Sequence, residues 1–196
     1  MSRHILIIRH GNTFASSAEA RRIGARTDIA LTDAGRAQAD RLGAHLASLH
    51  LPDCRLFSSP LARSRETAER IAAALGLHDV AILPWLNEID HGPDEGRPEA
   101  EVVARLGEAA LADWDARGIA PPGWIVDRAA RLAAWRDFFR EEREGTDLLV
   151  TSNGAARFAL LAAGLESGSL KLRTGAFGWL TVRDGAVGLV QWDERP

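Results

Sequence analysis

Polar residues follow four short apolar runs in this chain, each group standing directly where a run ends. In chain order the groups are Arg9-His10-Gly11, Ser58 to Arg63, Trp85 to Glu88, and Ser152 to Gly154. A guanidinium group binds phosphate oxygens in a fork, an imidazole with a free lone pair is a nucleophile, and a carboxyl group is a proton donor. These residue types together predict chemistry on a phosphate ester or a similar oxyanion.

The runs themselves have the length and composition of buried strands. They cover residues 4–8, 54–57, 80–83 and 147–151, and short runs without polar alternation are typical of strands covered on both faces. Helical patterns stand between them at 32–49, from Ser58-Ser59-Pro60 to Gly76, and at 154–163. Thr32 is expected to cap the first helix, and Asp184-Gly185 predicts a C-terminal hairpin.

The alternation of strands and helices predicts an α/β fold, specifically a three-layer α/β/α sandwich with a mainly parallel central sheet. In such a sheet ligands bind outside the carboxyl ends of the strands. Because each polar group follows a strand, all four groups are expected on one rim. That rim would hold two guanidinium groups, one imidazole, one carboxyl group and a helix N-terminus, which binds anions through its free N–H groups.

Length and pattern predict one domain with an insertion. The chain has 196 residues, which suits a single domain over 1–196. Between 92 and 146 the pattern changes to scattered prolines and tryptophans. We interpret this segment as a largely helical insertion, or cap, over one edge of the sheet.

Composition limits the partners. The formal net charge is −3, so no global basic field attracts nucleic acid or anionic lipid. Cys54 is the only cysteine, which excludes an internal disulfide and a thiolate metal cluster. The start of the chain does not have the pattern of a signal peptide, and no stretch has the roughly 18 apolar residues of a spanning helix. We therefore expect a cytoplasmic protein that binds neither nucleic acid nor membrane.

Four blocks in this order resemble the motifs of the histidine phosphatase superfamily, the phosphoglycerate-mutase-like proteins. The blocks are ILIIRHGNT with the following RIGARTDIALTDAGRAQA, SSPLARSRETA, LPWLNEIDHG, and LLVTSNGAARFAL. The resemblance covers most of the chain outside 92–146. It implies hydrolysis of a phosphomonoester on a small phosphorylated metabolite, without metal or other cofactor, through a phosphohistidine on His10. Glu88 would give a proton to the leaving oxygen.

The resemblance also implies the residues around the phosphate. Arg9, Arg63, Asn153 and Gly154 would bind its oxygens, and Asn12, Thr13 and Arg22 would contact the rest of the substrate. We expect Arg9 and Arg63 to lower the pKa of His10, because positive charges disfavour imidazolium. The other ring nitrogen of His10 should donate to a backbone carbonyl. Gly11, which has no Cβ, should let the backbone pass close to phosphate.

The last block departs from the family's pattern, in which a second histidine stands directly before the glycine. This chain has Asn153 there, and the nearest arginine to the family's helix arginine is Arg157. Asn153 either donates to phosphate or caps the helix that begins at Gly154. The alternatives to a hydrolase are therefore a catalytically impaired member that binds phosphoesters or a partner protein, and a phosphoglycerate-type mutase. The chain would be a monomer or a homodimer.

Overall fold

The apolar runs form the strands of a six-stranded sheet in the order β3-β2-β4-β1-β5-β6. The computed structural model describes residues 2–16 and 18–196. Its strands are β1 (Ser2–Arg9), β2 (Cys54–Ser58), β3 (Ala81–Ile82), β4 (Gly145–Thr151), β5 (Phe177–Arg183) and β6 (Ala186–Glu194). The first four pair in parallel, whereas β5 and β6 are antiparallel and form the predicted hairpin.

Helices cover both faces of this sheet. They are α1 (Asp33–Ser48), α2 (Ala62–Leu75), α3 (Glu99–Leu106), α4 (Glu108–Arg117), α5 (Arg128–Arg140) and α6 (Asn153–Ala163). Alternate residues of β1 point to opposite faces: Leu6 and Ile8 pack with the residues of α1 and α2, while Ile5 and Ile7 pack with those of α5 and α6. The predicted α/β/α sandwich is confirmed. None of the helices described here has both the length and the apolar character to cross a membrane.

Both ends of α1 and the end of α2 lie close to their predicted positions, whereas the start of α2 does not. The prediction that residues 58–60 open this helix is wrong. Pairing with β4 carries the chain further, since the Ser59 N–H donates to the Val150 carbonyl at 2.9 Å. The helix begins at Ala62, and its N–H donates to the Asp28 carboxylate at 2.6 Å. A side chain from a distant loop therefore caps α2, which no local pattern indicates.

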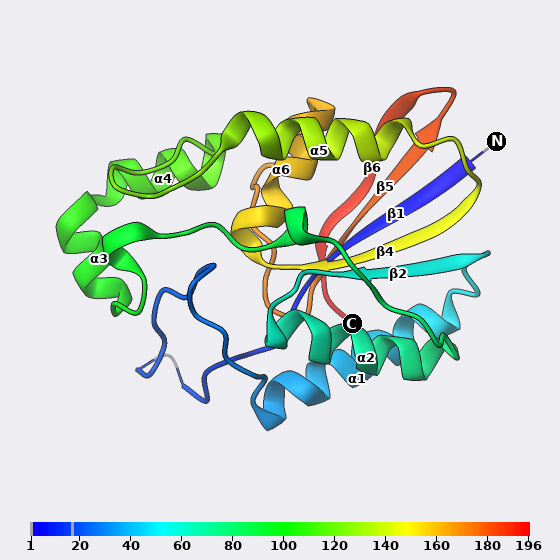
Figure 1. Cartoon of the computed structure of the whole chain (residues 1–196), viewed down its shortest axis with the longest axis horizontal. Coiled ribbons are helices and arrows are strands. Elements are labelled where there is room, and N and C mark those ends of the chain that lie inside the picture. The colour runs from blue at the N-terminus through cyan, green and yellow to red at the C-terminus, as the bar shows by residue number, and fades with distance from the viewer. Residues whose placement is uncertain (1, 17) are drawn as a thin grey trace.

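The helical segment predicted over 92–146 divides into two parts. In Figure 1, α3 and α4 lie at one end of the molecule, beyond the ends of the strands. In contrast, α5 packs beside α6, and its Trp135, Phe138 and Phe139 belong to the main core. Only α3 and α4 therefore have the position of a cap, and α5 is part of the sandwich.

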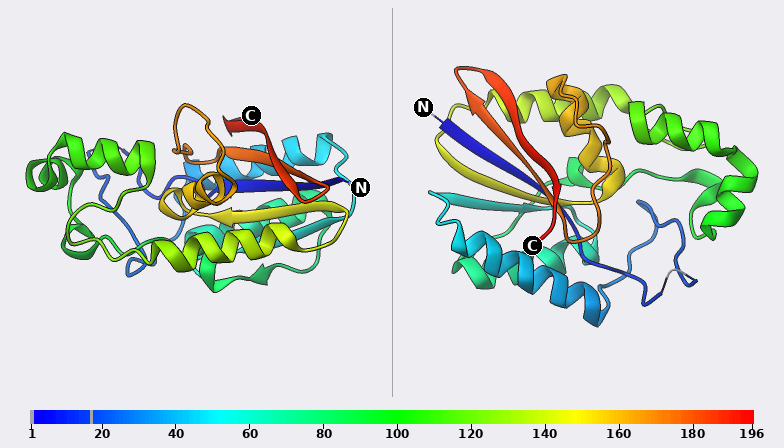
Figure 2. Two further views of the ribbon diagram at one scale, coloured as in Figure 1. Left: turned by 90° about the horizontal axis from the view of Figure 1, so that it is seen from above. Right: turned by 180° about the vertical axis from the view of Figure 1, so that it is seen from behind.

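The loop between β1 and α1 lies at the same end of the molecule as α3 and α4. It runs beside α3, as the right view of Figure 2 shows, and Arg21 forms an isolated antiparallel bridge with Pro98. In Figure 1, β1 runs from the N label toward this end. The carboxyl ends of the parallel strands therefore open toward a space between the early loop and the cap helices.

The opposite ends of the strands are joined by a buried carboxylate. Asp147 of β4 is fully buried and accepts hydrogen bonds from Arg3 at 2.5 Å, Arg143 at 2.7 Å and Arg55 at 2.8 Å. Arg3 is itself only 2% exposed. Arg3 belongs to β1, Arg55 to β2 and Asp147 to β4, so the cluster links these three neighbouring strands.

Asp147→Asn should lower the free energy of unfolding by about 3–5 kcal/mol, because it removes the buried counterion of Arg3 and leaves only the half-exposed Glu141 at 3.4 Å. Urea unfolding followed by circular dichroism measures this. Asp137→Asn is the matched control, since Asp137 is 72% exposed in its pair with Arg140 and an exposed pair contributes about 0–1 kcal/mol. Equal, small effects of both substitutions would contradict a structural role for the cluster.

Candidate active site

His10 directly follows β1, and its ring has one fixed tautomer. Its Nδ1 lies 2.8 Å from the Gly11 carbonyl oxygen. A carbonyl oxygen only accepts, so the proton must be on Nδ1 and the lone pair on Nε2. Arg63 donates from Nε to that Nε2 at 3.2 Å. The tautomer expected for a nucleophilic imidazole is therefore the one that the backbone imposes.

The surroundings of His10 keep the ring neutral. Burial lowers its pKa most, the Arg63 and Arg9 charges lower it further, and the hydrogen bond to Gly11 opposes them only in part. The pKa lies well below the usual value near 6.5. An unprotonated Nε2 is therefore available at neutral pH, which a nucleophile requires.

Gly11 is needed for a reason other than the predicted approach of phosphate. A Cβ on Gly11 would lie 2.3 Å from the Gly35 carbonyl oxygen, and a Cβ on Gly35 would lie 2.1 Å from the Asn12 carbonyl oxygen. The two backbones touch, so neither position has room for a side chain. This contact packs the start of α1 directly against the residues that follow β1, and so fixes the position of the backbone next to His10.

Arg63 lies in the first turn of α2 and is fully buried. Besides His10 it donates to the carbonyl oxygens of Thr27 at 2.6 Å and Gly24 at 3.2 Å. The early loop therefore holds the guanidinium against the ring. Because its Nε–H lies on the Nε2 lone pair, attack on phosphorus requires that this N–H turn to an oxygen of the incoming group.

Arg9 brings a second guanidinium to the same rim. Its Nη1 donates to the Leu172 carbonyl at 2.7 Å, while Nε is buried without a partner among the described residues. Burial lowers its pKa most, to about 10, against the opposing charge of Glu88. Arg9 therefore stays charged at neutral pH and has an unused N–H group.

Glu88 is buried and bound by two backbone N–H groups. Its carboxylate accepts from Ile89 at 2.8 Å and from Gly154 at 3.0 Å. The expectation that the Gly154 N–H is open to phosphate is thus not met in this structure, because Glu88 takes that donor. A Cβ on Gly154 would lie 2.3 Å from a Glu88 oxygen, so glycine is required for this contact.

The same contacts set the ionisation of Glu88. Burial alone would raise its pKa, but His91, the two N–H groups and Arg63 outweigh burial and hold the pKa below the usual value near 4.5. The carboxyl group is therefore ionised at neutral pH. It becomes a proton donor only when another negative charge enters the site and raises its pKa.

Asn153 is not a helix cap, and that alternative is wrong. Ser152 is the N-cap residue of α6, and Asn153 is the first residue within it. Its Oδ1 accepts from the Leu172 N–H at 2.9 Å, which fixes the orientation of the amide because a backbone N–H only donates. The amide nitrogen is then the end left for the cavity that Asn153 lines.

These groups surround a cavity of about 320 Å³ at the carboxyl ends of the strands. The predicted residues in its wall are Arg9, Arg22, Glu88, Asn153 and Gly154. His10 and Arg63 do not line it; they are hydrogen-bonded to each other, and the charges of the wall residues Arg9 and Glu88 act on His10 and Arg63 respectively. The structure therefore brings together seven of the residues predicted for the site.

Asn12 and Thr13 do not line this cavity. The Asn12 N–H donates to Gln38 at 2.8 Å, and its Oδ1 accepts from the Thr174 hydroxyl. These bonds hold the loop after His10 to α1 and to the segment before β5. Asn12 is engaged in positioning the loop rather than in reaching the cavity.

The wall of the cavity also contains residues that the sequence did not indicate, among them Glu99, Asp115 and Lys171. Glu99 of α3 forms an ion pair with the predicted Arg22, and Lys171 pairs with Asp115 of α4 at 2.5 Å. Trp114 also lines the cavity. Lys171 is the only lysine of the chain, and this was the one feature that could have drawn attention to it. No sequence spacing predicts that it pairs with α4.

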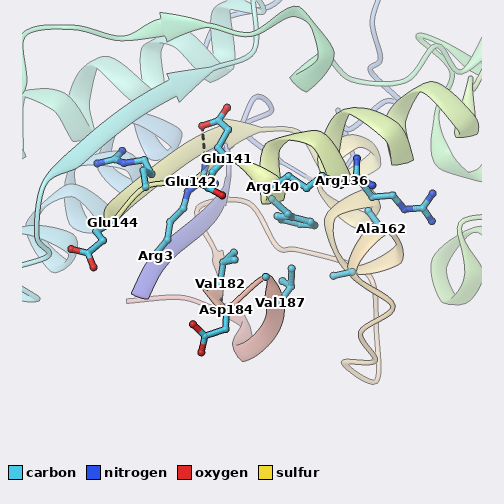
Figure 3. A pocket seen from close by; sticks show the side chains of 14 residues that line it. Arg3, Arg136, Arg140, Glu141, Glu142, Glu144, Ala162, Val182, Asp184 and Val187 are labelled. Carbon is cyan, nitrogen blue, oxygen red and sulfur yellow. Dashed lines mark hydrogen bonds and ion pairs between the residues drawn. The ribbon is translucent and has the colours of Figure 1, made fainter. Parts of the chain in front are cut away.

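A larger hollow of about 850 Å³ lies elsewhere, between the end of α5, α6 and the β5–β6 hairpin (Figure 3). Its wall contains Arg3 at the start of β1 and Gly185 in the hairpin turn. It therefore lies at the amino ends of the parallel strands, away from His10. Figure 3 shows charged side chains of both signs around it, and none of the predicted site residues line it.

Comparison with known sequences shows the family. The profile of the histidine phosphatase superfamily (branch 1) matches residues 5–194. A probable phosphoglycerate mutase of Erwinia tasmaniensis is 32% identical over 161 residues, which cover 81% of this chain and 73% of that protein. A 2,3-bisphosphoglycerate-dependent phosphoglycerate mutase of Mesorhizobium japonicum is 29% identical over 187 residues, covering 89% and 90%.

Solved structures share the fold. The native structure of a mycobacterial glucosyl-3-phosphoglycerate phosphatase superposes with a TM-score of 0.75, covering 98% of this chain and 99% of that one at 22% identity. At this identity the likeness concerns the fold alone. It places the whole chain, cap helices included, within one known architecture.

The ring of His10 should stay unprotonated at pH 6.5, where a free imidazole is about half protonated, because its pKa lies well below that value. Nitrogen-15 chemical shifts of the imidazole measure this. Arg63→Gln removes a neighbouring charge and should raise the pKa, whereas Arg70→Gln, which breaks an outer pair on the same helix, should leave it unchanged. A His10 that titrates near 6.5 in the parent would contradict the geometry.

Proposed function

The chain belongs to the histidine phosphatase superfamily, and from that premise we propose that it hydrolyses phosphomonoesters of small metabolites through a phosphohistidine on His10. The observation that carries the proposal is the neutral His10 ring, with its lone pair on Nε2 and two guanidinium groups beside it. This is the arrangement that nucleophilic attack on phosphorus needs.

In the first step Nε2 of His10 forms a bond to phosphorus as the ester oxygen leaves. Arg9 and Arg63 stabilise the charge on the remaining phosphoryl oxygens, with the Arg63 Nε–H moving from Nε2 to oxygen. The bound phosphate adds negative charge beside Glu88 and raises its pKa. Glu88 then carries the proton that a phosphomonoester, whose second pKa is about 6, brings into the site, and passes it to the leaving oxygen.

In the second step water attacks phosphorus, and the electron pair of the P–N bond returns to Nε2. The Gly11 carbonyl keeps the Nδ1 proton in place throughout, so the leaving imidazole is the same neutral tautomer that attacked. The Asn153 amide nitrogen is a donor for one phosphoryl oxygen. A neutral donor contributes about 0.5–1.5 kcal/mol, against roughly 1.5–3 for a charged one.

The cavity limits the substrate. Its volume of about 320 Å³ suits a small phosphorylated molecule, at the low end for ligand pockets of roughly 300–1,000 Å³. The Arg22–Glu99 and Lys171–Asp115 pairs present both charge signs to the part of the substrate remote from phosphorus.

The protein should release phosphate from p-nitrophenyl phosphate and from a panel of small phosphate esters, and His10→Ala should abolish this, because no other residue replaces the nucleophile. A malachite-green assay measures phosphate. Asp137→Asn serves as a surface control at parent rate. No turnover by the parent, or equal turnover by His10→Ala, would overturn the proposal; conversion of 3-phosphoglycerate to its isomer without phosphate release would favour a mutase instead.

Asn153→His should raise kcat about five- to thirtyfold. An imidazolium at this position would give a phosphoryl oxygen a charge-assisted hydrogen bond, which gains about 1–2 kcal/mol over the neutral amide. Steady-state kinetics with p-nitrophenyl phosphate measures this, with Asn153→Ala as the matched loss of the donor. A lower rate for Asn153→His than for the parent would mean that the site is built around the amide.

A further inference from the structure

Leu172, in the segment between α6 and β5, is hydrogen-bonded to two side chains of the proposed phosphate site. Its carbonyl accepts from Arg9 Nη1 at 2.7 Å, and its N–H donates to Asn153 Oδ1 at 2.9 Å. Both of these side chains line the cavity, and the side chain of Leu172 itself is fully buried in the main core. The backbone at Leu172 therefore sets the direction in which Arg9 and Asn153 present their remaining N–H groups.

The peptide group that binds Arg9 is held from its other side by Asp193 of β6. The Arg173 N–H belongs to the same peptide group as the Leu172 carbonyl, and it donates to Asp193 Oδ1 at 2.6 Å. The Arg173 side chain adds a second bond, from Nε to Asp193 Oδ2 at 2.7 Å. Because a peptide group is planar, a partner on each side prevents its rotation. Asp193 therefore fixes the carbonyl that orients Arg9.

The peptide group that binds Asn153 is held in the same way by Trp192. The Lys171 carbonyl belongs to the same peptide group as the Leu172 N–H, and it accepts from Trp192 Nε1 at 3.0 Å. Trp192 and Asp193 are consecutive residues of β6. One short stretch of this strand therefore holds both peptide groups of Leu172.

A β-bulge accounts for the position of these two residues. The register between β5 and β6 shifts here, so that Trp192 and Asp193 together stand opposite the single residue Gly178. Asp193 has a φ of 61°, in the left-handed region that residues other than glycine rarely adopt. A Cβ on Gly178 would lie 2.1 Å from Trp192 Cε3, so the indole ring occupies the space over this glycine. Bulges are common beside active sites, where they redirect side chains, and strained residues cluster at functional sites.

We propose that Trp192 and Asp193 are positioning residues for phosphate binding, with Asp193 acting through Leu172 on Arg9 and Trp192 acting through Leu172 on Asn153. The inference rests on the proposed function, because it concerns side chains assigned there to phosphate. Neither residue is among the described residues that line the cavity. The charge of Asp193 acts on Arg9 as well: burial lowers the pKa of Arg9 most, to about 10, and Asp193 is among the charges that oppose this.

Asp193→Gly tests the action on Arg9, because glycine keeps the left-handed backbone without strain and removes the side chain that binds Arg173. With p-nitrophenyl phosphate it should lower kcat/KM about tenfold or more, since a distant mutation that displaces a reacting group by about 1 Å can cost about 10²-fold. The affinity for inorganic phosphate, measured by calorimetry, should fall as well. Asp193→Asn, which keeps an oxygen for the Arg173 N–H, should stay close to the parent in both measurements.

Asp184→Gly is the matched control. Asp184 has a φ of 50°, is exposed, and lies in the turn at the other end of the β5–β6 hairpin. The same substitution in the same backbone conformation should therefore leave turnover and phosphate affinity at the parent values. Thermal unfolding checks the fold of each variant, and Asp193→Ala replaces Asp193→Gly if the latter does not fold.

Double-mutant cycles distinguish positioning from a general loosening of the fold. If Asp193 acts through Arg9, Asp193→Gly should change kcat/KM and phosphate affinity little in an Arg9→Gln background. Trp192→Phe keeps a ring but lacks the N–H donor. It should lower both quantities by a smaller factor, because a neutral donor contributes less than a charged one, and this effect should disappear in an Asn153→Ala background.

Two results would overturn the inference while the proposed function stands. One is a folded Asp193→Gly with the turnover and phosphate affinity of the parent. The other is a loss from Asp193→Gly that is equally large with Arg9 and with Arg9→Gln, because the effect would then not pass through Arg9. The same two results for Trp192→Phe, with Asn153→Ala as background, would overturn the action on Asn153.

The phosphate affinities keep this test separate from the test of the proposed function. A parent that binds inorganic phosphate but hydrolyses no ester would refute the proposed function alone, since the affinities of the variants still measure positioning. A parent that neither binds phosphate nor hydrolyses an ester would refute both.

Discussion

The hydrogen bond from His10 Nδ1 to the Gly11 carbonyl is the interaction on which the site depends. It holds the proton on one nitrogen and leaves the other as a lone pair, while burial and two guanidinium charges keep the ring from taking a second proton. The carbonyl can stand there only because Gly11 and Gly35 allow β1 and α1 to touch. The packing of this helix against the end of the strand therefore helps to determine which nitrogen of the nucleophile carries the proton.

Much of this arrangement was predictable from the sequence. Apolar runs long enough for strands, each followed by polar residues, indicate a parallel sheet, and the parallel sheet brings its carboxyl ends to one rim. Arg9, His10, Arg63 and Glu88 therefore had to converge, whatever their separation in the chain. The tautomer of His10 followed from the chemistry of a nucleophile, and the structure confirms its partner.

The rest depends on contacts that no local pattern encodes. Asn153 was equally suited to a cap and to a donor role, and only the Leu172 N–H decides which end of the amide faces the cavity. The Gly154 N–H was counted for phosphate, but the loop after β3 brings Glu88 onto it. His91 stands three residues after Glu88, and only the fold shows that it lines the cavity with Glu88 and Asn153.

The central claim is that Nε2 of His10 is the atom that bonds to phosphorus. Rapid mixing with a phosphate ester, an alkaline quench and phosphorus-31 NMR of the isolated peptide distinguish phosphorylation at Nε2 from phosphorylation at Nδ1. The account predicts a phosphohistidine at Nε2 of His10, because the Gly11 carbonyl keeps Nδ1 protonated. A phosphoryl group on Nδ1, on another residue, or on none during turnover would contradict it.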